Sequence, residues 1–375
     1  MKTFLLAPDS FKGTLSAAQV CAIQSSVIRK HVPGAVIHAI PMADGGEGMV
    51  ESYLGIMGGR RVTAPVTAPL GGTVDAVYGV LPDGSAVMEM ASAAGLPLAA
   101  GRENPLEATT YGVGELLLHA AASGIRKVLL GIGGSCTNDC GIGMAAALGF
   151  RFLDCGGRPV EPLAKNLGRI RQILPPASLP ELELRVACDV DNPLLGEHGA
   201  TYTFGPQKGA DAAMLAQLEA GMTQFAQVLT AFSGISAASF PGGGAAGGLG
   251  AALRILLDGR LMPGAELLLD SVGFDALLRE ADIVWTGEGR IDWQSAHGKV
   301  PGAVGRRCAA AGVPCIALCG SIGKGAGLLY DSGISAIFSA VQGACSFEEV
   351  QQASAASLEF LADAVLRLLT LQDRH

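Results

Sequence analysis

Acidic, hydroxyl and basic side chains follow short apolar runs at three points of the sequence, each time beside glycine. They are Asp9, Ser10 and Lys12 in "APDSFKG" (7–13), Asp44 and Glu47 in "ADGGEG" (43–48), and Glu288, Arg290 and Asp292 in "TGEGRID" (286–292). Carboxylates beside cations can bind an anion, hold a metal ion or move a proton. Glycine lets the backbone come close to a ligand. These three segments are therefore the first candidates for an active site.

A second group of polar and glycine residues lies in the middle of the chain. It comprises Gly134, Ser135, Thr137, Asn138 and Asp139 in "GIGGSCTNDCGIG" (131–143), Asp189 and Asn192 in "CDVDNPL" (188–194), Gln207 and Lys208 in "GPQKGA" (205–210), and Gly243, Gly244 and Gly247 in "GGGAAGGLG" (242–250). The first of these segments follows an expected strand and opens a helix, where backbone N–H groups can hold an anion. The last matches G-x-G-x-x-G, but no clear strand precedes it, so it is a weak dinucleotide signature.

Four lysines lie beside glycines, a setting that favours binding of an anion by the loop. Lys12, Lys208, Lys299 and Lys324 each neighbour a glycine. A lysine in this setting can reach a phosphate or carboxylate as a compact positive charge.

The two ends of the chain show the elements that could position these loops. We expect strands at 3–7, 35–40, 281–286, 314–319 and 334–339, and helices at 14–31, 46–57, 299–311 and 347–370. Thr14 or Ser16 is the expected N-cap of the first helix, and Ser346 with Glu349 forms a capping box for the last. Five strands from the two ends predict one α/β domain with a flavodoxin-like, doubly wound parallel sheet of order 2-1-3-4-5.

The middle of the chain reads as a second α/β domain inserted into the first. Residues 61–92 alternate in the manner of antiparallel hairpins, and strands near 126–132 and 183–188 alternate with helices near 107–122, 139–149 and 211–232. We therefore expect a discontinuous domain of residues 1–60 plus 281–375 and an inserted domain of residues 61–280. Two sequential domains divided near 150–180 are the alternative.

The predicted sheet brings two of the polar loops together. Ligands of such sheets bind beyond the carboxyl ends of the strands, at the switch point between the first and third strands in sheet numbering. These strands end in "APDSFKG" and "TGEGRID", so we expect their acids and cations to face each other, with "ADGGEG" at the same edge.

Composition limits the partners. The net charge of −8 disfavours nucleic acid or an anionic membrane surface as the main partner. The sequence has no apolar run of 18 residues and no signal-peptide pattern at its start, so no membrane span is predicted. Nine cysteines without C-x-x-C spacing are interpreted as reduced thiols of a cytoplasmic protein. Oligomeric state is left open.

Carboxylates, lysines and glycine loops across a cleft favour phosphoryl transfer, which needs Mg²⁺, cations for the migrating charge and an acid for the acceptor hydroxyl. Hydride transfer would need a better dinucleotide signature. "GSIGKG" (320–325) is not a Walker A motif, since its spacing is wrong and no Ser or Thr follows the lysine. A hydroxy-acid dehydrogenase and a non-catalytic two-domain protein that binds small anions remain the alternatives.

Together, "APDSFKGTLSA", "PMADGGEGM", "GIGGSCTNDCGIGMAAALG", "GPQKGA", "GGGAAGGLGAAL" and "TGEGRIDWQSAHGKVP" resemble the type 1 glycerate kinases of bacteria, from residue 3 to about residue 370. The resemblance implies two α/β domains and ATP-dependent phosphorylation of D-glycerate with Mg²⁺, giving 2-phosphoglycerate. Trp293 departs from the small polar residue expected in the "IDxQ" block.

The resemblance suggests roles for the candidate residues. Asp189, Asp292 and Asp9 are candidates for the acid roles, one as base and the others near Mg²⁺, for which Asp189 and Asp292 are the expected ligands. Lys12, Lys208 and Lys299 would neutralise the triphosphate or the substrate carboxylate, and Lys12 is placed among the catalytic residues with the two aspartates. Loops 133–139 and 242–250 would hold phosphate oxygens through backbone N–H groups.

Overall fold

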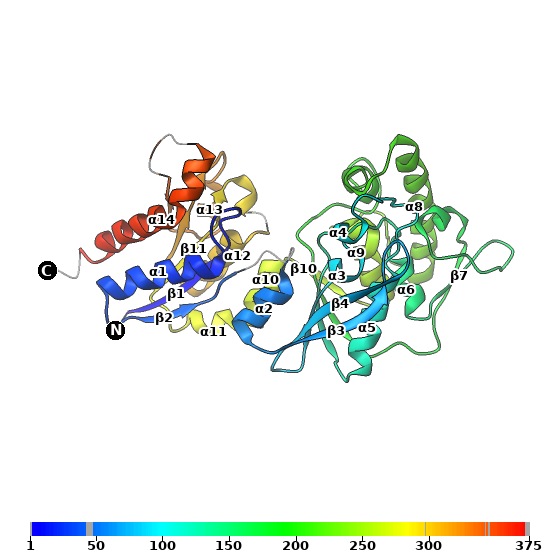
Figure 1. The fold of residues 1–375 in the computed structure, drawn as a ribbon, viewed down its shortest axis with the longest axis horizontal. Coiled ribbons are helices and arrows are strands. Elements are labelled where there is room, and N and C mark those ends of the chain that lie inside the picture. The colour runs from blue at the N-terminus through cyan, green and yellow to red at the C-terminus, as the bar shows by residue number, and fades with distance from the viewer. Residues whose placement is uncertain (1, 43–47, 297, 342, 344–345, 372–375) are drawn as a thin grey trace. The chain divides into compact units, whose positions relative to one another are not determined.

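A computed structural model describes residues 2–42, 48–296, 298–341, 343 and 346–371 (Figure 1). The chain is a mixed α/β protein with parallel sheets, as the sequence predicts. It divides into two compact units, unit 1 with Met1–Asp44 and Pro263–His375, and unit 2 with Gly45–Met262. Asp44 and Glu47 lie outside the described residues. Within the described part of the chain, every helix is too short or too polar to span a bilayer.

Unit 1 is built on a five-stranded parallel sheet of order β15-β13-β11-β1-β2. Its strands are β1 (Thr3–Pro8), β2 (Val36–Ala39), β11 (Ile283–Gly287), β13 (Cys315–Cys319) and β15 (Ala336–Ser339). β1, β11 and β13 are buried and almost entirely apolar, which is typical of parallel strands covered on both faces. The short strands β12 (Arg290–Ile291) and β14 (Ser321–Ile322) pair beyond the ends of β11 and β13.

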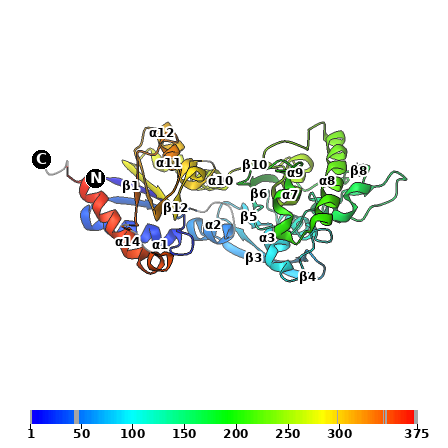
Figure 2. The ribbon, with the colours of Figure 1, turned by 90° about the horizontal axis from the view of Figure 1, so that it is seen from above.

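Helices cover both faces of this sheet. α1 (Ala17–His31) and α14 (Phe347–Leu369) pack together on one side, and α12 (Val300–Ala311) lies on the other (Figure 2). Ser16 and Ser346 each form a capping box with the residue three positions later. These boxes fix where α1 and α14 begin. The remaining helices of the unit are α10 (Gly264–Ser271), α11 (Phe274–Leu278), α13 (Leu328–Asp331) and the 3₁₀ turn η3 (Trp293–Ala296).

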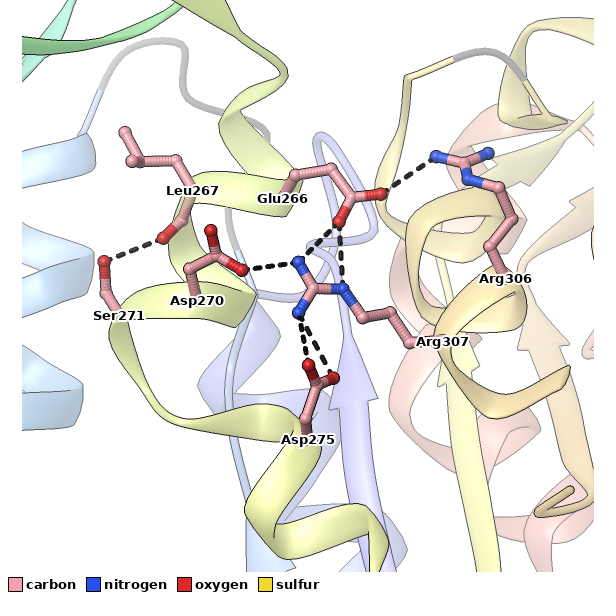
Figure 3. A network of polar contacts seen from close by, with 7 residues as sticks. All are labelled: Glu266, Leu267, Asp270, Ser271, Asp275, Arg306 and Arg307. Atoms are coloured by element: carbon pink, nitrogen blue, oxygen red, sulfur yellow. Dashed lines mark hydrogen bonds and ion pairs between the residues drawn. The ribbon is translucent and has the colours of Figure 1, made fainter. Parts of the chain in front are cut away.

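An arginine of α12 ties residues 264–278 to unit 1. Figure 3 shows Arg307 donating hydrogen bonds to Glu266, Asp270 and Asp275, which come from α10 and α11. These three carboxylates raise the pKa of Arg307 against the cost of its burial. The boundary predicted near residue 280 therefore differs from the observed one, which follows Met262.

The boundary predicted near residue 60 differs as well. α2 (Met49–Met57) packs against β4 (Thr73–Val80) and β5 (Ala86–Glu89) of unit 2. The backbone N–H of Gly48 donates to Glu89 Oε1 at 2.7 Å, and that of Val50 to Glu89 Oε2 at 3.3 Å. Because Glu89 ends β5, these bonds hold the start of α2 in unit 2.

Unit 2 has a six-stranded sheet of order β10-β9-β6-β5-β4-β3. Its strands are β3 (Arg60–Thr67), β4 (Thr73–Val80), β5 (Ala86–Glu89), β6 (Lys127–Gly131), β9 (Glu183–Ala187) and β10 (Arg260–Met262). The first three form the antiparallel hairpins that the sequence predicts, and β5, β6, β9 and β10 run parallel. A separate hairpin joins β7 (Arg151–Leu153) and β8 (Gln172–Leu174).

The helices of unit 2 enclose its core. Besides α2, they are α3 (Ala91–Ala94), α4 (Leu96–Ala99), α5 (Tyr111–Ala122), α6 (Ile142–Ala147), α7 (Ala200–Phe204), α8 (Ala212–Ser233) and α9 (Ala245–Leu256), with 3₁₀ turns η1 (Ala164–Arg169) and η2 (Pro206–Lys208). The glycine-rich loop predicted over 242–250 overlaps α9, which begins at Ala245, but the backbone is regularly helical only after Gly248, so the prediction was wrong only for the last two residues. The helix is kinked where Ala246, Gly247 and Gly248 take positive φ.

Candidate active site

A cleft of about 890 Å³ lies in unit 1, beyond the carboxyl ends of β1, β11, β13 and β15. The N-terminal half of α14 forms one of its walls. Six residues predicted from the sequence line it: Ser10, Lys12, Glu288, Arg290, Asp292 and Lys299. The structure thus brings the β1 loop and the β11 loop together at the edge where parallel sheets bind their ligands.

Glycines allow these loops to pack directly on one another. A Cβ atom on Gly287, whose φ is +154°, would lie 1.7 Å from the carbonyl oxygen of Leu318 in β13. A Cβ on Gly320 would lie 2.4 Å from the carbonyl oxygen of Gly289. Neither position accepts a larger residue, so these glycines set the spacing of the loops that present the charged side chains.

Glu288 is the most unusual of the charged groups in the cleft. Its side chain is only 9% exposed, and Lys299 Nζ lies 3.6 Å from its Oε2. Burial raises the pKa of Glu288, although a hydrogen bond from Ser295 and the charge of Lys299 oppose the rise. Among the described residues, no hydrogen-bond partner reaches Oε1. A buried carboxylate oxygen without a partner is costly unless a bound group satisfies it.

Two aspartates stand beside Glu288 in different settings. Asp292 accepts a hydrogen bond from the backbone N–H of Gln294 at 2.9 Å, and its Oδ2 lies 3.8 Å from Arg290 Nε. Asp9 is buried and accepts from the N–H of Ser10 at 2.6 Å, while its own N–H donates to Gly287 O at 2.8 Å. Asp9 therefore joins β1 to β11 behind the cleft, and Asp292 lines it.

Glu288 and Asp292 can serve as ligands of Mg²⁺. In proteins this ion usually takes one or two carboxylates and completes its shell with water and substrate phosphates. Among the described residues, no group of three or more His, Cys, Asp or Glu side chains is arranged to hold a metal. A pair of carboxylates with an orphaned buried oxygen fits an ion that arrives with a phosphorylated substrate.

In unit 2, Lys208 lies entirely within the protein. Its Nζ donates to Ser135 Oγ at 2.8 Å and to the carbonyl oxygen of Thr137 at 2.6 Å. Burial lowers the pKa of Lys208 to about 8, while the nearby Cys136 and Asp139 act in the opposite sense. Lys208 is thus an internal support of the 135–138 loop.

The carboxylate of Asp139 likewise accepts hydrogen bonds from groups inside the protein. Its carboxylate accepts hydrogen bonds from the N–H and hydroxyl of Thr110, both at 2.8 Å, and from the N–H groups of Gly141 and Gly143. Burial raises the pKa of Asp139, and these four bonds oppose the rise. Asp139 therefore ties the residue before α5 to the start of α6.

The other predicted residues of unit 2 range from exposed to fully buried. Asp189 and Gln207 are exposed, Gly134 and Asn192 are half-buried, and Ser135, Thr137, Asn138, Gly243, Gly244 and Gly247 are buried. A Cβ on Gly247 would lie 2.1 Å from the carbonyl oxygen of Thr137, so the kinked start of α9 packs on the 137–140 loop. Within the described residues, Thr137 Oγ1 and Asn138 Oδ1 are buried without a hydrogen-bond partner.

Sequence reasoning missed the α14 wall of the unit 1 cleft. Glu349, Val350, Ala353, Ser354 and Ser357 line it. Their spacing places them on one face of the helix. Small residues repeat on that face, but the same repeat occurs on ordinary surface helices and does not by itself indicate a site.

Comparisons with known proteins agree over nearly the whole chain. A family model described as the glycerate kinase family matches residues 4–370. A glycerate kinase of Halalkalibacterium halodurans is 44% identical over 364 residues, covering 96% of each chain. A glycerate 2-kinase of Escherichia coli K12 is 40% identical over 350 residues, covering 92% of each. The crystal structure of a putative glycerate kinase 2 from Salmonella typhimurium LT2 matches with a TM-score of 0.86 and 37% identity, covering all of both chains.

Proposed function

The chain belongs to the glycerate kinase family, and from this premise we propose that it transfers the γ-phosphoryl group of ATP to the 2-hydroxyl of D-glycerate. The observation that carries the proposal is the full-length match to proteins named for this activity. The unit 1 cleft supports it, because carboxylates and cations gather there at the binding edge of a parallel sheet.

The cleft supplies the groups that phosphoryl transfer requires. Lys12, Arg290 and Lys299 can neutralise charge on the transferring phosphoryl group. Asp292 and Glu288 would hold Mg²⁺, which when bound offsets the negative charge of the phosphates. Asp189, in unit 2, remains a catalytic and metal-ligand candidate from the sequence, and its variant is tested separately.

We further infer that unit 1 is a flavodoxin-like domain and that unit 2 is a domain inserted into it. Parallel order in the unit 1 sheet, with strands from both chain ends, supports this division. The buried segment 135–138 and the glycines at 243–247 stay candidates for phosphate contacts through backbone N–H groups.

A coupled assay of ADP release tests the function. Release that depends on both ATP and glycerate is expected, whereas a dehydrogenase or an anion-binding protein would release none. Lys12→Ala, Asp292→Asn and Asp189→Asn should each lower kcat/KM at least about a hundredfold, the range seen when one group that stabilises a transition state is removed. Lys30→Ala, which changes a 70% exposed lysine of α1, is the matched control and should keep full activity. Near-normal rates in a folded variant would remove that residue from the catalytic set.

A further inference from the structure

The two sides of the unit 1 cleft differ in the kinds of side chain that line them. One side carries the charged residues of the β1 and β11 loops, and the other is formed by α14 and the chain after β15. We propose that this cleft is the nucleoside triphosphate site, with the base and sugar against the small-residue face of α14 and the phosphates toward Lys12 and Lys299. The inference rests on the proposed kinase function and assigns one of its two substrates.

The volume of the cleft favours the larger substrate. Pockets for drug-sized ligands have volumes of about 300–1,000 Å³ and bury most of the ligand. At about 890 Å³ the cleft lies in the upper part of this range. A three-carbon acid would fill only a small part of it and leave the α14 wall in contact with water.

The α14 wall has the shape and chemistry that a base and sugar need. Val350, Ala353, Ser354 and Ser357 lie on one helix face, and Ala340 and Val341 extend the surface after β15. These side chains are short, so they leave room for a flat ring and offer it apolar contact. The hydroxyls of Ser354 and Ser357 add polar groups that can fix its orientation, as is usual in pockets of this kind.

The charged side suits phosphates that carry a metal ion. Glu288 and Asp292 would repel the carboxylate of glycerate if that acid lay beside them alone. A nucleotide brings Mg²⁺, for which the two carboxylates are suitable ligands, and its phosphates can meet Lys12 and Lys299. Glu288 Oε1, which has no hydrogen-bond partner among the described residues, marks the place where such a ligand is needed.

Binding of ADP to a variant of the α14 wall tests the proposal without relying on turnover. Ala353→Trp would fill the space assigned to the base. We expect the Kd for ADP, measured by calorimetry, to rise at least tenfold while the KM for glycerate stays within twofold. Ala355→Trp, on an exposed position of the same helix outside the cleft, is the control and should change neither value. Ser357→Gln is a smaller change that should weaken ADP binding in the same direction.

Binding of adenosine, which has no phosphates, distinguishes contacts with the base and sugar from contacts with the phosphates. Ala353→Trp should weaken adenosine and ADP alike, whereas Lys299→Met should weaken ADP and leave adenosine unchanged. The proposal is overturned if ADP affinity in Ala353→Trp stays within twofold of the wild type, or if the KM for glycerate rises as much as the Kd for ADP. Failure of the kinase function itself would be seen separately, as absence of glycerate-dependent ADP release by the unmodified protein.

Discussion

The buried Lys208 gives a prediction whose size follows from its surroundings. Lys208→Met keeps the length of the side chain but removes its charge and both hydrogen bonds. At pH 7 Ser135 Oγ and the carbonyl oxygen of Thr137 lose their donor, which costs about 1–3 kcal/mol when the groups are buried. Because methionine also removes the cost of burying a charge at pH 7, we expect the stability deficit of the variant in unit 2 to be at most this amount at that pH.

The difference in stability between the wild type and Lys208→Met should grow as the pH rises. Burial lowers the pKa of Lys208 from 10.5 to about 8, so the folded protein releases this proton at lower pH than the unfolded chain. The unfolded chain then binds more protons between about pH 8 and 10.5, and the stability of the wild type rises with pH over that window. Lys208→Met has no such group. The free energy of unfolding of the variant should therefore fall further below that of the wild type, by about 2 kcal/mol between pH 7 and pH 9.5, at about 1.4 kcal/mol for each pKa unit.

Native-state hydrogen exchange of the peptide covering β6 and the 132–141 loop measures this difference. Both tryptophans, Trp285 and Trp293, belong to unit 1, so their fluorescence does not report on this segment. Lys127→Met, which changes an exposed lysine at the start of β6, is the control and should show no growing deficit. A deficit of Lys208→Met that is constant or smaller at pH 9.5 would refute the reasoning.

Three further predictions concern unit 1. Gly287→Ala should cost more than about 4 kcal/mol, since its Cβ would force β11 from Leu318; an unfolding midpoint close to the wild-type value, followed by tryptophan fluorescence, would contradict this. Arg307→Met removes the cation that three carboxylates share, although Glu266 keeps its contact with Arg306, and should lower stability by about 1–3 kcal/mol in the same assay; an unchanged midpoint would show that the network is not stabilising. Glu288→Gln should lower kcat/KM at least about a hundredfold. The kcat/KM of the wild type should fall as acid protonates Glu288, at a pH above the ordinary range for glutamate, because burial raises the pKa of this side chain. A variant that keeps both the wild-type kcat/KM and its fall in acid would exclude a catalytic role of Glu288.

Local sequence signals predicted many of the elements. The capping box at Ser346 and Glu349 predicted the start of α14, and Ser16, one of two candidate N-caps, is the N-cap of α1. The hairpins of residues 61–92 were visible because alternation and glycine turns are local. α9 was missed because glycines have low helix propensity, and the positive φ values at 246–248 are supported only by tertiary packing.

The candidate site was predictable where residues follow strand ends. Glu288 and Asp292 could be found because they come directly after a buried strand, whereas the wall at Ala353 could not, since small residues on a helix also occur on ordinary surfaces. Lys208 looked like a cation for a ligand. Its burial depends on loops more than sixty residues away in the chain, so no local pattern shows it.

Phosphorus NMR of the product tests the central claim most directly. The protein, incubated with ATP, Mg²⁺ and D-glycerate, should form ADP and a phosphate monoester on carbon 2 in equal amounts, with no inorganic phosphate in excess. ADP accompanied only by inorganic phosphate, or no ADP at all, would contradict the account of this chain as a glycerate kinase. An ester on carbon 3 would contradict the proposed position of transfer.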